Sequence, residues 1–138
     1  MTDFIGVKIA LIKDDEVLVI LRDDKPGLRN ANLWDFPGGG REDNETPFEC
    51  VAREVDEELK IKLTPKSITW EKTYPAMHDP SLTAYFMVAK INDNDIKNIV
   101  FGDEGQGWKM IKVADFMSDP SVIEALKGRL KDYLSSAP

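Results

Sequence analysis

Residues 38–61 read GGGREDNETPFECVAREVDEELKI and place consecutive glycines before a segment with the signals of an α-helix. Thr46 suits the N-cap, Pro47 suits the first helical position, and Glu49 completes a capping box with Thr46. At about 100° per residue, the apolar side chains fall on one side of this helix. They are Phe48, Val51, Ala52, Val55 and Leu59. The segment therefore predicts a helix that begins at Pro47 and packs this side against a core.

The neighbouring side of the same helix carries Glu54, Glu57 and Glu58. Repulsion among these carboxylates and from the helix dipole costs about 0.3–1 kcal/mol for each contact at a surface. A solvated acidic face, partly neutralised by Arg53 paired with Glu57 or Glu49, is therefore one interpretation. The other is a platform of oxygen ligands for a divalent cation such as Mg²⁺. The glycines favour the second, because they let the backbone approach a ligand closely.

The spacing of these residues is similar to the signature of the Nudix hydrolase family, Gly-x5-Glu-x7-Arg-Glu-apolar-x-Glu-Glu-x-Gly-apolar. The match runs from Gly39 to Ile61, and its charged positions are Glu45, Arg53, Glu54, Glu57 and Glu58. Lys60 departs from the signature, because the family has glycine there to end the helix in a left-handed turn. The preceding LWDFPGG, residues 33–39, also resembles the family's lead-in to the helix.

The resemblance implies an α/β fold of the α/β/α sandwich type, with a mixed β-sheet flanked by helices. It also implies hydrolysis of a nucleoside diphosphate linked to a further group. Glu57 and Glu58 would be the principal ligands of Mg²⁺, for which Mn²⁺ is a substitute. Glu54 would be a further ligand or the base that deprotonates or orients water, and a carbonyl of Gly38 or Gly39 would complete the ligands.

Other residues are implied to support this chemistry. Arg53, grouped here with the catalytic residues, and Glu45 would hold the loop and the glutamates in register. The family also commonly supplies a general base from outside the signature, and FGDEGQGW, residues 101–108, offers Glu104 in a glycine-flanked loop. Asp103 is an equal candidate by charge, and a solvated loop acid is the alternative interpretation of either residue.

The composition is that of one globular domain, which we expect to span residues 1–138, with 42% hydrophobic and 31% charged residues. No apolar run approaches the roughly 20 residues of a membrane span, and the start lacks the layout of a signal peptide, so a cytoplasmic location is expected. Cys50, the only cysteine, is interpreted as a small packed residue. The net charge of -7 argues against nucleic acid as the main partner.

The rest of the chain predicts a mixed sheet with helices packed against it. Two strands and a KDDE turn predict a hairpin between Gly6 and Leu21, and residues 22–32 predict a loop. Further strands are expected at SITWEKTY (67–74), LTAYFMVAKI (82–91) and GWKMIKV (107–113), with a turn at NDND (92–95). A last helix is expected with Asp119 as its N-cap and Pro120 at its first position. Its apolar stripe would cover the sheet with Val122, Ile123, Leu126, Leu130 and Tyr133.

Substrate selection has weaker signals in the sequence. Candidates for phosphate contacts are Arg22, Lys25 and Arg29, although charged loop residues are often only solvated. Candidates for stacking on a nucleobase are Trp34, Phe36, Tyr85 and Trp108, with core packing as the alternative. The single histidine, His78, lies in a loop near the expected pocket and is assigned no catalytic role.

These features favour a Mg²⁺-dependent pyrophosphohydrolase that converts a canonical or modified nucleoside triphosphate to the monophosphate and pyrophosphate. Nucleotide sugars, ADP-ribose and dinucleoside polyphosphates stay open as substrates, and capped RNA is less expected for an acidic chain. Lys60 alone favours a non-catalytic module that binds nucleotide or metal. A purely structural protein would require the spacing match to be accidental. The base, the sugar, the number of metal ions and the formation of a homodimer stay open.

Overall fold

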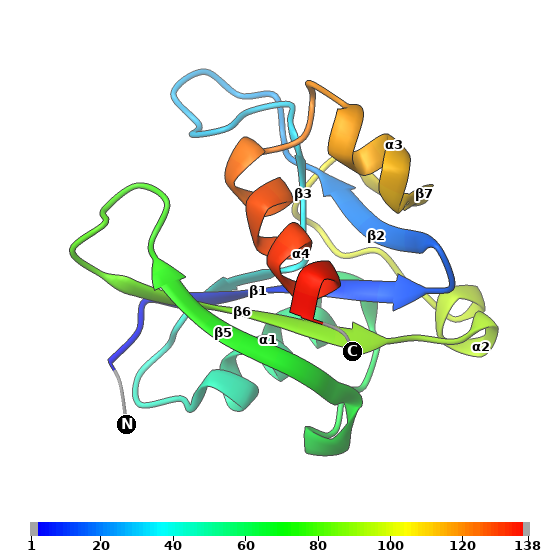
Figure 1. Cartoon of the computed structure of the whole chain (residues 1–138), viewed down its shortest axis with the longest axis horizontal. Helices are drawn as coiled ribbons and strands as arrows, with labels where there is room; N and C mark the ends of the chain where they lie inside the picture. The colour runs from blue at the N-terminus through cyan, green and yellow to red at the C-terminus, as the bar shows by residue number, and fades with distance from the viewer. Residues whose placement is uncertain (1–2, 137–138) are drawn as a thin grey trace.

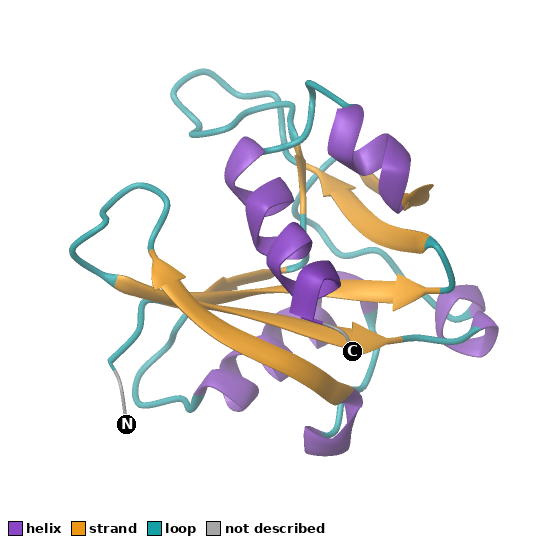
Figure 2. Ribbon diagram, viewed as in Figure 1, coloured by secondary structure: helices purple, strands orange, loops and turns teal. Residues whose placement is uncertain are grey.

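The structure is a computed structural model that describes residues 3–136. Figure 1 shows the course of the chain, and Figure 2 shows its helices and strands in the same view. In chain order the elements are β1 (Gly6–Lys13), β2 (Glu16–Leu21), β3 (Trp34–Asp35), β4 (Gly38–Gly40), α1 (Pro47–Leu59), the 3-10 turn η1 (Pro65–Ser67), β5 (Ile68–Pro75), β6 (Thr83–Lys90), α2 (Asp93–Lys97), β7 (Gly107–Lys112), α3 (Val113–Ser118) and α4 (Glu124–Ser136).

The strands form one mixed, seven-stranded sheet. Its main path is β3-β2-β1-β6-β5, while β4 pairs with β1 and β7 pairs with β2. β1 and β6 run parallel, and the other pairs of neighbouring strands in this sheet are antiparallel. The predicted hairpin is confirmed, because β1 and β2 pair with Ile12 opposite Val17.

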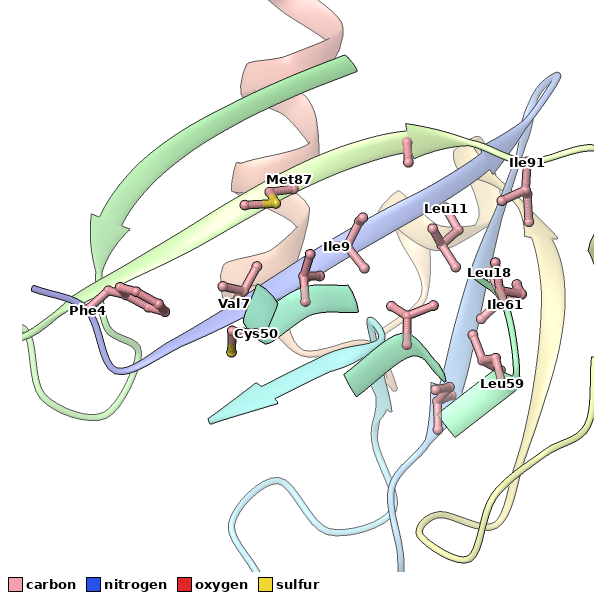
Figure 3. Close-up of a cluster of buried hydrophobic side chains, with 14 residues drawn as sticks. Phe4, Val7, Ile9, Leu11, Leu18, Cys50, Leu59, Ile61, Met87 and Ile91 are labelled. Atoms are coloured by element: carbon pink, nitrogen blue, oxygen red, sulfur yellow. The ribbon is translucent and has the colours of Figure 1, made fainter. Parts of the chain in front are cut away.

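Helices cover both faces of this sheet. Successive residues of a strand point to opposite faces, so Ile9 of β1 packs with α1 while its neighbour Ala10 packs on the α4 side. Figure 3 shows the α1 side, where Cys50 and Leu59 lie among side chains from the strands. Leu126 and Leu130 of α4 and Phe116 of α3 fill the other core. The predicted sandwich of a mixed sheet between helices is confirmed.

Two segments expected to be loops or turns contain regular structure. Gly38–Gly40 forms β4 by pairing with β1, where Gly39 lies opposite Val7. The NDND segment is the start of α2 rather than a turn. Asn92 caps this helix, because its side chain accepts a hydrogen bond from the Asp95 N–H at 2.8 Å and its own N–H donates to the Asp95 carboxylate at 3.0 Å.

The end of the chain differs from its prediction. Asp119 is not the N-cap of the last helix, which begins at Glu124. The backbone N–H of Trp34 donates to the carbonyl of Ser121 at 2.7 Å, and the backbone carbonyl of Trp34 accepts from the N–H of Ile123 at 3.1 Å. The segment before the helix therefore pairs with β3. The expected strand at 107–113 ends at Lys112, and the unpredicted helix α3 follows it.

Within residues 3–136, the helices are too short or too polar to cross a membrane. The cytoplasmic location expected from the sequence stays a prediction.

Candidate active site

Helix α1 presents the acidic residues, and both of its ends are fixed by local bonds. The Thr46 side chain accepts from the Glu49 N–H at 3.2 Å, and the Glu49 carboxylate accepts from the Thr46 N–H at 2.9 Å, which confirms the capping box. At the other end Lys60 is left-handed, with φ of 59° and ψ of 31°, and its N–H donates to the carbonyl of Asp56. Lysine therefore adopts the helix-ending conformation for which glycine is the usual residue.

Arg53 holds the acidic side of α1 to the preceding loop. Its Nε and Nη2 donate to the two carboxylate oxygens of Glu45 at 2.7 and 3.0 Å. Its Nη1 donates to Glu54 at 2.8 Å and to Glu57 at 3.1 Å, and Nη2 also donates to the Gly40 carbonyl at 2.9 Å. The Arg53 hydrogen bond lowers the pKa of Glu45 to about 2. Of the two expected partners of Arg53 on the helix, the structure selects Glu57.

Glu58 and Glu54 are the more enclosed carboxyl groups of the cluster. Glu58 accepts a hydrogen bond from the Gly38 N–H at 2.8 Å. Burial nevertheless raises the pKa of Glu58 to about 8, with a smaller contribution from the charges of Glu54 and Asp35. Burial also raises the pKa of Glu54, although Arg53 opposes the shift. In both groups burial therefore favours the protonated, neutral form over the carboxylate.

The glycines place the backbone directly against these carboxyl groups. A side chain at Gly39 would collide with the carboxylate of Glu54, so only glycine allows this approach. Gly38 has φ of +130°, and a side chain there would meet the Val7 carbonyl. The Gly39 carbonyl lies 3.7 Å from Cys50 Sγ, a weak donor. Burial raises the pKa of Cys50 to about 11, which agrees with a packed thiol.

The loop after α2 brings further acids to the cluster. Gly102 donates to the carbonyl of Glu58 at 2.9 Å, and Val100 donates to the carbonyl of Leu59 at 3.1 Å, so the last carbonyls of α1 anchor this loop. A pocket of about 270 Å³ results, and every side chain that lines it is acidic. They are Glu42, Glu54, Glu57, Glu58, Asp103 and Glu104.

Within residues 3–136, no three of these acids stand in the arrangement of a formed metal site. The hydrogen bonds explain this, because Glu54 and Glu57 turn toward Arg53 while Glu58 turns toward Gly38. The chemistry of the donors still fits a divalent cation, since carboxylate and carbonyl oxygens are the ligands that Mg²⁺ prefers. Glu57 has room to turn away from Arg53, because 57% of its side chain is exposed.

A larger pocket of about 440 Å³ adjoins the acidic one and shares Glu54, Glu58 and Glu104 with it. Cationic side chains of Lys8, Arg22 and Lys25 also line this larger pocket. The pocket lined only by acids therefore adjoins a pocket in which cations and acids lie together.

Lys8 and Asp35 were missed by the sequence analysis. Asp35 is buried and accepts hydrogen bonds from Lys8 Nζ at 2.9 Å and from Arg22 Nη1 at 3.4 Å. Arg22 also donates to the carbonyl of Arg29 at 3.1 and 2.8 Å. The available signal was a charged residue inside an apolar strand, VKIALI for Lys8 and LWDF for Asp35.

A third pocket, of about 260 Å³, meets the larger one at Lys8, Arg22, Asp35 and the glycine strand. We call it the side pocket. Its walls are mostly apolar, and they come from β1, β6, the loop before β6 and α4. The polar side chains that line it include Arg29, His78 and Arg129.

The aromatic candidates lie mainly in the core. Phe36 is buried and stacks on Phe116 with ring centroids 4.9 Å apart. Tyr85 and Trp108 pack against the core on the α1 side, and Trp34 lies beneath the Lys109 ammonium at 4.2 Å. Core packing is therefore the role that the structure gives to Phe36.

The chain is similar in sequence to a protein family and to two bacterial proteins. The family model described as NUDIX domain matches residues 4–132. An 8-oxo-dGTP diphosphatase of Proteus vulgaris is 55% identical over 60 residues, which are 44% of this chain and 52% of that protein, so the match spans about half of the relative. An 8-oxo-dGTP diphosphatase of Escherichia coli (strain K12) is 26% identical over 128 residues, 91% of this chain and 95% of that protein.

A solved structure has a similar fold. It is a bifunctional NMN adenylyltransferase/ADP ribose pyrophosphatase from Francisella tularensis, complexed with AMP and a Mn ion. Its TM-score is 0.75 and its identity is 19%, over 98% of this chain and 42% of that one. At this level of identity the likeness shows the fold alone.

Proposed function

Because the chain belongs to the NUDIX domain family, we propose that it is a divalent-metal-dependent pyrophosphohydrolase. It would convert a nucleoside triphosphate, canonical or modified, to the monophosphate and pyrophosphate. The observation that carries this proposal is the pocket lined only by acids, joined to a larger pocket with cationic side chains. A polyanionic substrate can enter such a site when metal ions neutralise the acids.

The residues that would hold the cation are Glu54, Glu57, Glu58 and a carbonyl of Gly38 or Gly39. When bound, Mg²⁺ or Mn²⁺ supplies Lewis-acid polarisation of a phosphate oxygen and lowers the pKa of a water molecule. The Gly38 N–H holds Glu58 in place through its 2.8 Å hydrogen bond.

Other side chains bind the substrate and move the proton. Lys8, Arg22 and Lys25 line the larger pocket and would bind phosphate oxygens there. Glu104 lines both the larger and the acidic pocket, whereas Asp103 lines the acidic pocket alone. Glu104 is therefore the better placed general base, and it would take the proton of the attacking water.

Arg53 acts on the reaction through the glutamates. It bonds to Glu45 at two points and to Glu54 and Glu57 at one point each. Both glutamates bond to the same Nη1, and Glu57 has more room to turn toward a cation because its side chain is 57% exposed against 18% for Glu54. Arg53 is thus a positioning residue in this proposal.

The names of the relatives support a nucleoside triphosphate, since two of them are 8-oxo-dGTP diphosphatases. ADP-ribose is the second candidate, because the similar structure from Francisella tularensis belongs to an ADP ribose pyrophosphatase. A non-catalytic binding module is the third, and only turnover separates it from the first two.

The test is product analysis with a panel of nucleoside triphosphates, 8-oxo-dGTP, ADP-ribose, a nucleotide sugar and a dinucleoside polyphosphate. Each is incubated with Mg²⁺, with Mn²⁺ and with a chelator. Release of monophosphate and pyrophosphate from a triphosphate, only with metal, is the expected result. Turnover of ADP-ribose alone would select the second candidate. Metal binding without turnover of any compound would contradict an enzyme.

A further inference from the structure

Arg129 of α4 is a buried cation with few partners. It is 5% exposed. Among residues 3–136 its side chain makes one hydrogen bond, from Nη2 to the Pro75 carbonyl at 3.1 Å, and its guanidinium lies 4.9 Å from the centroid of the Tyr74 ring. A guanidinium has several N–H donors, so most of its donors lack an acceptor in the described part of the chain. Burial lowers the pKa of Arg129, as expected for a charge with little compensation.

Arg129 lines the side pocket and has donors without an acceptor in the described part of the chain. In the described structure, every fully enclosed side-chain nitrogen or oxygen has a hydrogen-bond partner, so the unpaired nitrogens of Arg129 reach open space. Arg129 borders two such spaces, the side pocket and a shallower surface depression next to Tyr74 and Pro75. Tyr74 and Pro75, which line the depression, already contact the guanidinium of Arg129. The side pocket is the deeper of the two spaces and the one that joins the larger pocket.

The side pocket has the chemistry of a site for a flat ring with acceptors at its edge. Apolar residues such as Ala84, Met77 and Ile123 form its walls. Its cationic side chains offer donors, while its one carboxylate, Asp35, is already bonded to Lys8 and Arg22. Figure 1 shows that α4 lies on the face of the sheet opposite α1, and both α4 and the loop before β6 contribute residues to this pocket. Because the pocket opens into the larger one, a nucleoside can occupy it while its phosphates lie beside the acids.

We propose that Arg129 is a base-specificity residue that donates two hydrogen bonds to a nucleobase edge with two neighbouring acceptors. Guanine presents such an edge at O6 and N7, and cytosine presents one at N3 and O2. Adenine, thymine and uracil have no two adjacent acceptors, and 8-oxoguanine carries a proton on N7. Guanine and cytosine nucleotides are therefore preferred, and dGTP is preferred over 8-oxo-dGTP. This inference rests on the proposed function, because it places the nucleoside of the same substrate.

The test compares kcat/KM for dGTP, dCTP, dATP, dTTP, 8-oxo-dGTP and 7-deaza-dGTP, which lacks the N7 acceptor. The wild type is expected to favour dGTP or dCTP by about tenfold, the discrimination typical of a two-point arginine contact. Arg129→Leu should remove this preference and leave the other substrates within about twofold. Lys131→Leu, at an exposed position of the same helix, is the control and should keep the preference.

Three outcomes would overturn the inference while leaving the proposed function intact. They are equal turnover of all bases by the wild type, a preference for adenine, thymine or 8-oxoguanine, and an equal loss for every substrate in Arg129→Leu, which a purely structural role predicts. Arg129→Lys keeps the charge but not the two-point geometry. If Arg129→Leu fails to fold, Arg129→Lys is expected to show the same loss of preference, and retention of it would overturn the inference.

Measurements of nucleotide binding test the role of Arg129 even if the protein hydrolyses no nucleotide. If no nucleotide is hydrolysed with Mg²⁺, the proposed function fails, and selectivity is read from calorimetric binding of GMP, CMP, AMP and UMP. Tighter binding of GMP or CMP by about tenfold, lost in Arg129→Leu, would still support the role of Arg129. Equal binding of the four monophosphates would overturn it.

Discussion

Replacing Glu58 with glutamine tests the electrostatics of the site without any substrate. Burial raises the pKa of Glu58 to about 8 in the folded protein, against an ordinary value of 4.5. Between these values the unfolded chain has lost the proton while the folded chain retains it, so the wild type loses stability as the pH rises. At about 1.4 kcal/mol per pH unit, the loss reaches about 5 kcal/mol above pH 8.

Glutamine is neutral at every pH, and its amide oxygen can accept the Gly38 N–H as Glu58 does. Its NH₂ group takes the place of the second carboxylate oxygen, which borders the acidic pocket, so the amide costs at most about 1–2 kcal/mol. The metal-free variant should therefore be more stable than the wild type by about 3 kcal/mol at pH 9, and slightly less stable at pH 4.5.

Urea unfolding with a chelator at pH 4.5, 7 and 9 measures these differences. Asp56→Asn is the matched control on the same helix. Lys62 lowers the pKa of Asp56, so this carboxylate stabilises the fold above its ordinary pKa of 3.8, and Asp56→Asn should lose stability at neutral pH. A stability difference between Glu58→Gln and the wild type that is the same at every pH would refute the account of a buried, poorly compensated carboxyl group.

Four further substitutions test single residues. Arg53→Lys removes the two-point contact with Glu45 and should lower kcat/KM by about tenfold or more with the thermal unfolding transition retained; wild-type activity would contradict the positioning role. Glu104→Gln should lower kcat by about tenfold or more with the fold intact, and Asp103→Asn by less than about threefold, in steady-state assays; the reverse order would make Asp103 the base. Lys60→Gly should raise the free energy of unfolding, measured in urea, by about 0.5–1 kcal/mol, because φ of 59° strains lysine. A lower free energy of unfolding in the variant would exclude that strain.

The sequence predicts the parts of this protein that local interactions determine. The start of α1 follows from Thr46, Pro47 and Glu49, whose bonds form within one turn of the helix. The β1–β2 hairpin follows from alternating apolar residues on either side of a short turn. The acidic side of α1 follows from its helical spacing. None of these features depends on a distant part of the chain.

The missed features depend on partners far apart in the sequence. α4 begins late because its preceding backbone pairs with Trp34, and β4 exists because Gly39 lies opposite Val7. The same holds for the buried charges, since Asp35 is matched by Lys8 only after the strands assemble. The sequence does not predict that Arg129 is buried with few partners, because its contacts come from Tyr74 and Pro75, which are distant in the chain.

The rate of pyrophosphate release from a nucleoside triphosphate, followed as Mg²⁺ is titrated, tests directly whether the acids of α1 hold a catalytic cation. It is measured for the wild type, for Glu57→Gln and for the control Asp56→Asn. The account predicts Mg²⁺-dependent release by the wild type and the control, and a loss of about a hundredfold or more in Glu57→Gln at saturating substrate. Equal rates in the wild type and Glu57→Gln, or release that persists in a chelator, would contradict the claim that the acids of α1 hold a catalytic cation.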